Sequence, residues 1–303
     1  MTSTQFSTRE VPWMTLGRLE EEPKNMDDAI QLGGMNFDVE KRPAGYMTET
    51  GTWQTADNRM AVVHGKTGEV FDYVSHDYEV LQFREAFEFM QAVNPKYVAA
   101  GVLRGGRQGF IVVENDRVLR PAGDEHKLYT VLRTSHDRSR AVEVSVMPLR
   151  GACMNQLALA SFGRDAQQRW SIPHTRSMHD KMHQAQMTLT KVDEYADAFE
   201  KIVEQLTVTT PSEDQARKML ENAIRSGGKG RDEIFDAILH NWNENEETIG
   251  YNGTAWGLVN ATSEYLDWQK PKGTPQSRFL NALQGSTRQA LTSLAQDCLQ
   301  LAA

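Results

Sequence analysis

The hydrophobic pattern of this chain changes from mostly strand-like to helical near Pro173, and that change constrains the fold more than any other feature. Before about residue 173, apolar residues alternate with polar ones in short runs bounded by turn-forming residues. A period of two is typical of half-buried β-strands. After Pro173, apolar residues recur every three or four positions, as in amphipathic helices. The sequence therefore predicts an α+β protein, with antiparallel β-hairpins and a packed helix in its N-terminal half and an all-helical C-terminal half.

Three β-hairpins are expected in the N-terminal half. They join residues 60–63 with 70–74, residues 97–103 with 109–113, and residues 127–134 with 140–147. In the third hairpin, Val142, Val144 and Val146 alternate with Glu143 and Ser145, which is the pattern of a strand with one buried face. The turns contain glycine or short polar residues that suit tight connections.

Helices are expected on both sides of the change in period. Asn25 or Asp27 can cap a short helix that ends at Leu32, and Ser212 to Gln215 forms a capping box. The other expected helices cover residues 83–93, 149–162, 181–206, 231–242, 254–268 and 274–299. We expect a flexible lead-in at residues 1–24, an α+β hairpin domain at residues 25–175 and a helical domain at residues 176–303.

Composition limits the class of protein. No run of 18 apolar residues occurs, so no membrane span is expected. The first residues contain neither a basic segment nor an apolar segment of the kind that directs secretion. With two cysteines among 303 residues, no disulfide framework is expected. These features predict a cytoplasmic protein.

Charge is distributed unevenly along the chain. The formal net charge is −8, which argues against a nucleic-acid-binding protein when the chain is taken whole. Residues 84–181, however, contain 15 Lys and Arg against 10 Asp and Glu. A basic middle segment is compatible with an anionic ligand, and it is equally compatible with parts of the protein that neutralise each other across an interface.

Arginines at two hairpin turns are the strongest candidates for binding. Arginine suits phosphate because its planar guanidinium can donate two parallel hydrogen bonds. Exposed turns are commonly polar, so any one of these arginines can also be an ordinary surface residue. The predicted nucleic-acid-binding residues are Arg104, Arg107, Lys127, Arg133, Arg138, Arg140 and Arg150.

Catalytic and metal-binding patterns are weak. His179 and His183 would share one face of a helix, and His174 precedes them, so these three residues are a weak candidate for a metal site. Ser135, His136 and Asp137 are consecutive, and consecutive residues on a tight turn cannot form a Ser–His–Asp relay. We therefore predict no catalytic residue and no cofactor.

Several segments together resemble a known family. They are residues 78–89 (YEVLQFREAFEF), 100–107 (AGVLRGGR), 135–137 (SHD), 148–155 (PLRGACMN), 174–175 (HT) and 256–267 (WGLVNATSEYLD). With these segments the chain resembles the phage/plasmid-like protein family of unknown function, from actinobacterial phages and mobile elements, over about residues 13–287. Arg138 departs from the glycine that this family more often has after Ser-His-Asp.

A second similarity is architectural. Consecutive long hairpins beside a helix, with basic turns, resemble the Rad/Redβ-type single-strand annealing proteins. That resemblance implies a homo-oligomeric ring or filament that binds the phosphate backbone of single-stranded DNA without nucleotide hydrolysis.

Three functions remain open from the sequence. The first is binding of single-stranded DNA, with a role as an annealing recombinase. The second is a phage regulatory or protein-interaction factor that binds no nucleic acid, as the net charge of −8 suggests. The third is a metal-dependent enzyme.

Overall fold

A computed structural model of the chain describes residues 23–93, 96–149, 169–189, 192–224, 230–244, 250–269, 274 and 286–302. Two antiparallel sheets form the N-terminal half, and most of the C-terminal half is helical. The α+β prediction is therefore confirmed. Within these residues, the structure contains no helix of the length and apolar character needed to cross a membrane.

The smaller sheet has three strands in the order β1-β2-β3. Their bounds are Val39–Met47, Trp53–His64 and Val70–Ser75. The hairpin expected around the turn at residues 65–68 is confirmed as β2–β3, but β1 and the first half of β2 were missed. The reason is that both are largely exposed and polar, and Pro43 interrupts β1, so neither shows the alternation of a half-buried strand.

The larger sheet is a five-stranded meander in the order β4-β5-β6-β7-β8. Its strands are Lys96–Leu103, Gln108–Leu119, His126–Ser135, Val142–Leu149 and Arg169–Ile172. The second and third expected hairpins are confirmed as β4–β5 and β6–β7. The four-residue strand β8 was missed, because so short a segment carries little periodic signal.

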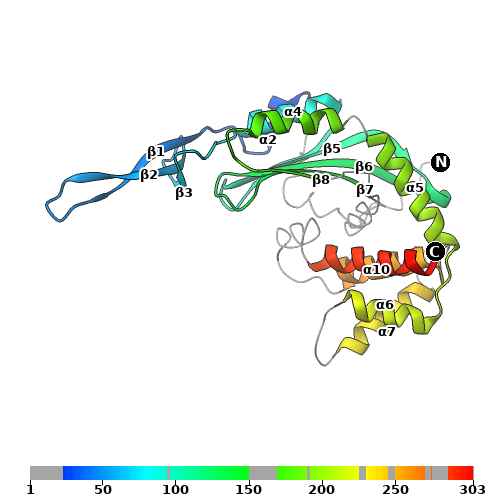
Figure 1. The fold of residues 1–303 in the computed structure, drawn as a ribbon. Coiled ribbons are helices and arrows are strands. Elements are labelled where there is room, and N and C mark those ends of the chain that lie inside the picture. Colours follow the sequence, from blue (N-terminus) through cyan, green and yellow to red (C-terminus); the bar gives the residue numbers. More distant parts are fainter. Residues whose placement is uncertain are drawn as a thin grey trace.

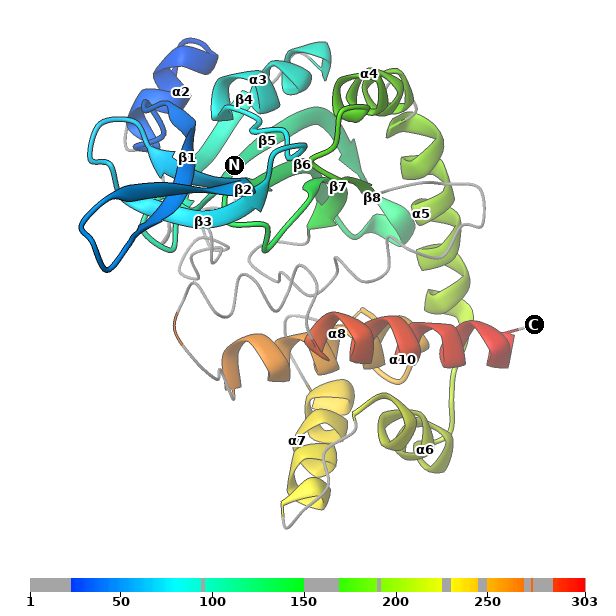
Figure 2. The same cartoon turned by 60° about the vertical axis from the view of Figure 1, so that its left-hand side comes forward.

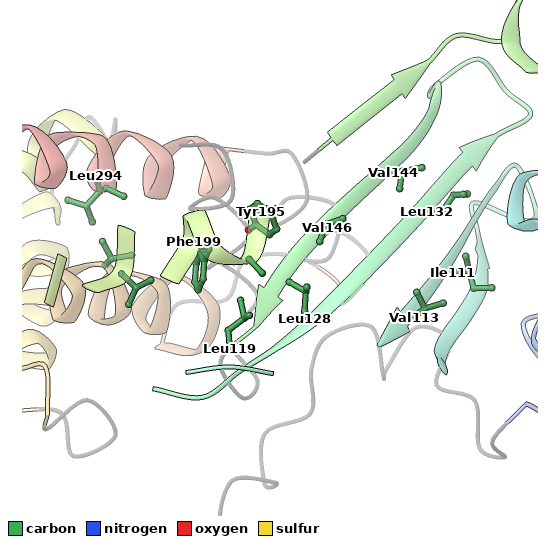
Figure 3. Packing of buried hydrophobic residues seen from close by; sticks show 14 of the residues in the cluster. Ile111, Val113, Leu119, Leu128, Leu132, Val144, Val146, Tyr195, Phe199 and Leu294 are labelled. Atoms are coloured by element: carbon green, nitrogen blue, oxygen red, sulfur yellow. The ribbon is translucent and has the colours of Figure 1, made fainter. Parts of the chain in front are cut away.

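Three helical segments cover one face of the larger sheet (Figure 2). They are α2 (Met26–Leu32), α3 (Phe83–Glu88) with the 3₁₀ turn η2 (Phe89–Val93), and α4 (Met178–Leu189). As predicted, the side chain of Asn25 caps α2 by accepting a hydrogen bond from the N–H of Asp28 at 3.0 Å. Ile111, Leu132 and Val144 lie opposite one another on neighbouring strands and contribute to the core beneath these helices (Figure 3).

The remaining helices lie on the other side of the larger sheet, and α5 (Val192–Val208) runs between the two parts (Figure 2). They are α6 (Glu213–Ala223), α7 (Arg231–Glu244), α8 (Ala255–Glu264) with the π turn η6 (Tyr265–Gln269), and α10 (Ser286–Ala302). The capping box predicted at the start of α6 is present, with Ser212 and Gln215 bonded reciprocally. The expected helix 181–206 corresponds to two helices, α4 and α5. The expected helix at residues 149–162 lies outside the described residues.

One apolar core joins the sheet to the C-terminal helices. Phe199 of α5 lies edge-on to Trp256 of α8, and both rings contact the ring of His126 at the start of β6. Tyr195 and Phe199 of α5 reach the ends of the central strands, next to Leu119 and Leu128 (Figure 3). The predicted boundary at residues 175 and 176 falls just before α4, and the core is continuous across it.

The three-stranded sheet has a small core of its own. Val39, Val62, Phe71, Val74 and Tyr78 form a cluster that is separate from the main core. Phe37, in the segment that leads into β1, packs against both clusters. The smaller sheet is therefore attached to the body through a limited junction.

Candidate nucleic-acid interface

Two turns that carry four of the predicted binding residues lie side by side at one end of the larger sheet. The backbone N–H of His136, in the β6–β7 turn, donates a hydrogen bond to the carbonyl of Arg107, at the end of the β4–β5 turn, at 2.8 Å. We call these two turns, with Arg104, Arg107, Arg138 and Arg140, the arginine turns. The sequence could not decide whether they share one end, and the meander topology places them there.

The β4–β5 turn has a left-handed backbone. Arg104, Gly105 and Gly106 have φ values of +53°, +68° and +90°. A left-handed φ is unfavourable for most L-residues and free of cost for glycine. A Cβ atom on Gly106 would lie 3.2 Å from Cζ of Phe37, so glycine also allows this turn to pack against the junction with the smaller sheet.

Arg107 is held by the smaller sheet. Its Nη2 lies 2.8 Å from a carboxylate oxygen of Glu69 and donates a hydrogen bond to the carbonyl of Val70 at 3.2 Å. Its guanidinium carbon also lies 5.4 Å from the ring centroid of Phe71, which is a cation–π arrangement. Three groups at the start of β3 thus bind one arginine.

Arg138, in the β6–β7 turn, is bound by the carboxylate of Asp72 in β3. Its Nε and Nη2 donate to the two oxygens of Asp72 at 2.5 and 3.2 Å, so the pair is bidentate. Burial acts to raise the pKa of Asp72, but the hydrogen bonds from Arg138 and from the N–H of Tyr73 outweigh it and lower that pKa below its ordinary value of 3.8. The hydrogen bond to Asp72 in turn raises the pKa of Arg138, so both groups are charged at neutral pH.

The other two arginines of the turns have different surroundings. Arg104 is exposed, and no acidic side chain of the described residues forms an ion pair with it. Arg140 is half-buried, and its buried Nε has no hydrogen-bond partner in the described ranges. The backbone N–H and carbonyl of Arg140 are both bonded to the hydroxyl of Ser135, which closes the turn.

A family model for a domain of unknown function, DUF932, matches residues 70–294, well over half of the chain. The chain belongs to the DUF932 family. The matched range begins at β3 and ends within α10, so it contains Asp72, both arginine turns and the helices from α3 to α8, and it leaves Glu69, β1 and β2 outside. No curated protein and no solved structure matches this DUF932 protein. Membership of an uncharacterised family is thus confirmed, and an origin in phages or mobile elements stays a prediction.

The remaining predicted binding residues of the DUF932 protein lie elsewhere. Lys127 is exposed at the opposite end of β6 from the arginine turns, and its Nζ lies 3.4 Å from Glu114. Arg133 is buried in an ion pair with Glu143 across β6 and β7, with side-chain exposures of only 8% and 9%. Arg150 lies outside the described residues.

Other basic residues of the middle segment also meet acidic residues. Arg117, near the end of β5, pairs with Asp193 at 3.0 Å, with Glu200 at 3.3 Å and with Asp197, all on α5. These contacts raise the pKa of Arg117, mainly through the hydrogen bond to Asp197. At these positions, charges from the basic middle segment and from the acidic flank neutralise each other across an interface.

The three histidines that form the weak candidate for a metal site differ in burial. His179 and His183 are exposed on α4, whereas His174 is buried. The ring of His174 stacks on Tyr78 and contacts the carbonyl of Glu79 at 3.2 Å and the hydroxyl of Thr134 at 3.4 Å. Burial lowers its pKa below the ordinary value. Within the described residues, no group of three or more His, Cys, Asp or Glu residues is arranged to hold a metal ion.

His136 is the residue in this region whose role the sequence did not reveal. Its side chain is fully buried between Phe71 of the smaller sheet and Phe83 of α3, with ring centroids 6.2 and 4.5 Å away. Neither ring nitrogen has a hydrogen-bond partner among the residues that the structure describes. Burial lowers its pKa to about 3, so the ring is neutral at ordinary pH. A polar residue within a turn signals exposure in the sequence, and only the packing of the smaller sheet buries this one.

The end of the β1–β2 ribbon is a second exposed surface. The strand β3 pairs with β2 only from Arg59 to Val63, so the ribbon beyond these residues projects alone from one end of the molecule (Figure 1). We call this projecting part, residues 44–56, the arm. It exposes Tyr46, Met47 and Trp53, whose exposures are 55%, 61% and 54%.

Proposed function

We propose that this DUF932 protein binds single-stranded DNA at the arginine turns, without catalysing a reaction. The observation that supports the proposal is the convergence of Arg104, Arg107, Arg138 and Arg140 at one end of the larger sheet. Guanidinium groups on adjacent turns can donate paired hydrogen bonds to successive phosphates of a flexible strand. Lys127 lies at the opposite end of the sheet and Arg133 is buried, so neither belongs to this surface.

The resemblance to single-strand annealing proteins supports an extension of this proposal. A homo-oligomeric ring or filament would align several copies of the arginine turns along one strand and leave the bases free to pair. Such a protein would belong to a phage or mobile element and work in the cytoplasm of the bacterial host.

The direct test is anisotropy of a labelled single-stranded oligonucleotide titrated with the full chain at several salt concentrations. We expect binding at low salt that falls log-linearly with salt concentration. Arg104→Glu should weaken binding at low salt by about tenfold, because one phosphate contact is lost and a repulsion replaces it. Lys218→Glu, on the exposed face of α6, is the matched control, since it changes the net charge equally, and should leave the affinity unchanged. Equal affinities of both variants and the wild type would refute the proposed site.

A protein-interaction function is the second candidate, and the arm favours it. Tryptophan, tyrosine and methionine are enriched in the energetically dominant parts of protein interfaces, and the arm exposes one of each. If a partner protein binds the arm, Trp53→Ala should abolish its capture without changing the affinity for DNA.

A further inference from the structure

We infer that Glu69 and Asp72 of the smaller sheet occupy a phosphate-binding site on the arginine turns, and that a single-stranded nucleic acid must displace them to bind. This inference rests on the proposed function and names the regulation of that site. It makes the three-stranded sheet an autoinhibitory cover for two of the four arginines.

The geometry of the Arg138–Asp72 pair is the first support. A bidentate carboxylate takes up both donors of one edge of a guanidinium, as a bound phosphate does. Asp72 does so with oxygens 2.5 and 3.2 Å from Nε and Nη2 of Arg138. A phosphate cannot bind the same edge until the carboxylate leaves.

The second support is that Arg107 is covered from the same strand segment. Glu69 precedes β3 directly and lies 2.8 Å from Nη2 of Arg107. The carbonyl of Val70 accepts a hydrogen bond from the same nitrogen. Four consecutive residues, 69–72, therefore bring two carboxylates to two arginines on neighbouring turns, and a single movement of this segment would uncover both.

The third support is that the smaller sheet can move as a unit. Its apolar cluster is separate from the main core and joins it through Phe37. Besides the arginine pairs, its contacts with the body include the stacking of Phe71 on His136 and two hydrogen bonds between the backbone of Val39 and the side chain of Gln82 at 3.0 and 2.8 Å. The hydroxyl of Tyr78, which follows β3, also donates to the carbonyl of Ser135 at 3.3 Å. Breaking the two ion pairs has a cost, because the side chains of Asp72 and Arg107 are only 22% and 31% exposed. Phosphate contacts of the same two arginines would offset that cost.

The electrostatic consequence can be measured. Each phosphate contact with single-stranded DNA adds about −0.7 to the slope of log affinity against log salt concentration. In the wild type, the displaced carboxylates offset the two contacts made by Arg107 and Arg138. Removing both negative charges should therefore steepen this slope by about 1.4. The affinity for single-stranded DNA at low salt should rise by about tenfold or more.

The experiment compares the full-length wild type with the double variant Glu69→Gln/Asp72→Asn, using a labelled oligo-dT strand at several salt concentrations. We expect the double variant to bind more tightly and with the steeper slope. Adding Arg107→Gln and Arg138→Gln to the double variant should remove both gains. If the wild type binds and the double variant has the same affinity and slope, the cover is refuted and the proposed function stands.

Chemical modification of His136 provides a second readout. Oligo-dT should make His136 reactive to diethyl pyrocarbonate in the wild type, because Phe71 of the smaller sheet stacks on its buried ring. An unreactive His136 in the bound state would refute displacement. If His136 of the double variant is reactive and the double variant still binds no oligo-dT at low salt, the proposed function itself fails. If the double variant binds poly-glutamate more tightly than the wild type does, and neither protein binds oligo-dT, the site is specific for acidic polypeptides. The nucleic-acid assignment is then overturned.

Discussion

Replacing His136 by phenylalanine should reduce the acid sensitivity of the folded state. The side chain is fully buried, and within the described part of the chain neither ring nitrogen has a hydrogen-bond partner. Burial is the main cause of its low pKa, the nearby His174 lowers it further, and Asp137 acts in the opposite direction. Phenylalanine has a similar shape and no polar atoms, so it fits the space between Phe71 and Phe83 without the desolvation cost of a buried imidazole.

The magnitude follows from the two pKa values of His136. Its pKa is about 3 in the folded state and 6.5 at its ordinary value. Below pH 6.5 the unfolded chain therefore binds a proton that the folded protein excludes, and the free energy of unfolding falls with pH until the folded-state pKa is reached. Between pH 7.5 and pH 4.5, roughly, this one group should lower the free energy of unfolding by about 3 kcal/mol.

The assay is urea unfolding of the wild type and of His136→Phe at both pH values. We expect the wild type to lose about 3 kcal/mol more on acidification than the variant. His174, whose pKa is also lowered, is present in both proteins, so the acid sensitivity that the variant retains includes its contribution. His76→Gln is the control, because the His76 side chain is 73% exposed and its loss should leave the acid sensitivity unchanged. Equal acid sensitivity of the wild type and His136→Phe would refute the argument. His136→Leu, measured in the same assay, shows whether a packing defect specific to phenylalanine affects the result.

Three further variants test the packing of the fold. Phe199→Ala should lower the free energy of unfolding by about 3–5 kcal/mol, measured by urea unfolding, because the ring fills the core that joins the sheet to α8. Gly106→Ala should destabilise by about 1–2 kcal/mol in the same assay, since its φ is +90° and a Cβ would lie 3.2 Å from Phe37; an unchanged midpoint would contradict the turn geometry. Trp53→Ala should change the stability by less than about 0.5 kcal/mol, because the side chain is 54% exposed, and a larger loss would show that the arm packs against the body.

The sequence determined the secondary structure wherever one face of an element is buried. Val142, Val144 and Val146 alternate with polar residues, and this pattern predicted β7 without coordinates, although the structure also buries Glu143 and Met147 on the other face of the strand. The capping residues Asn25 and Ser212 were also readable, since a cap depends on the chemistry of a few consecutive residues. The strand β1 could not be predicted from the sequence, because a ribbon exposed on both faces carries no periodic hydrophobic pattern.

The sequence also identified the residue types that can bind phosphate, but not their surroundings. Arg104, Arg107 and Arg138 look equivalent in a turn. In the structure the first is exposed, and the other two are bound by Glu69 and Asp72, which lie more than 30 residues away in the chain. Ion pairs of this kind depend on which strands meet, and local composition does not encode that.

The chain by itself thus determined the fold class, the hairpins and the candidate arginines of this DUF932 protein, because these depend on local periodicity and turn chemistry. Tertiary structure alone decided that the two arginine turns share one end of the sheet and that β3 covers them. It also decided that His136 is buried and neutral. The physical reason is the same in each case: burial and charge pairing depend on contacts between segments distant in sequence, and the packing of the smaller sheet on the larger one creates those contacts.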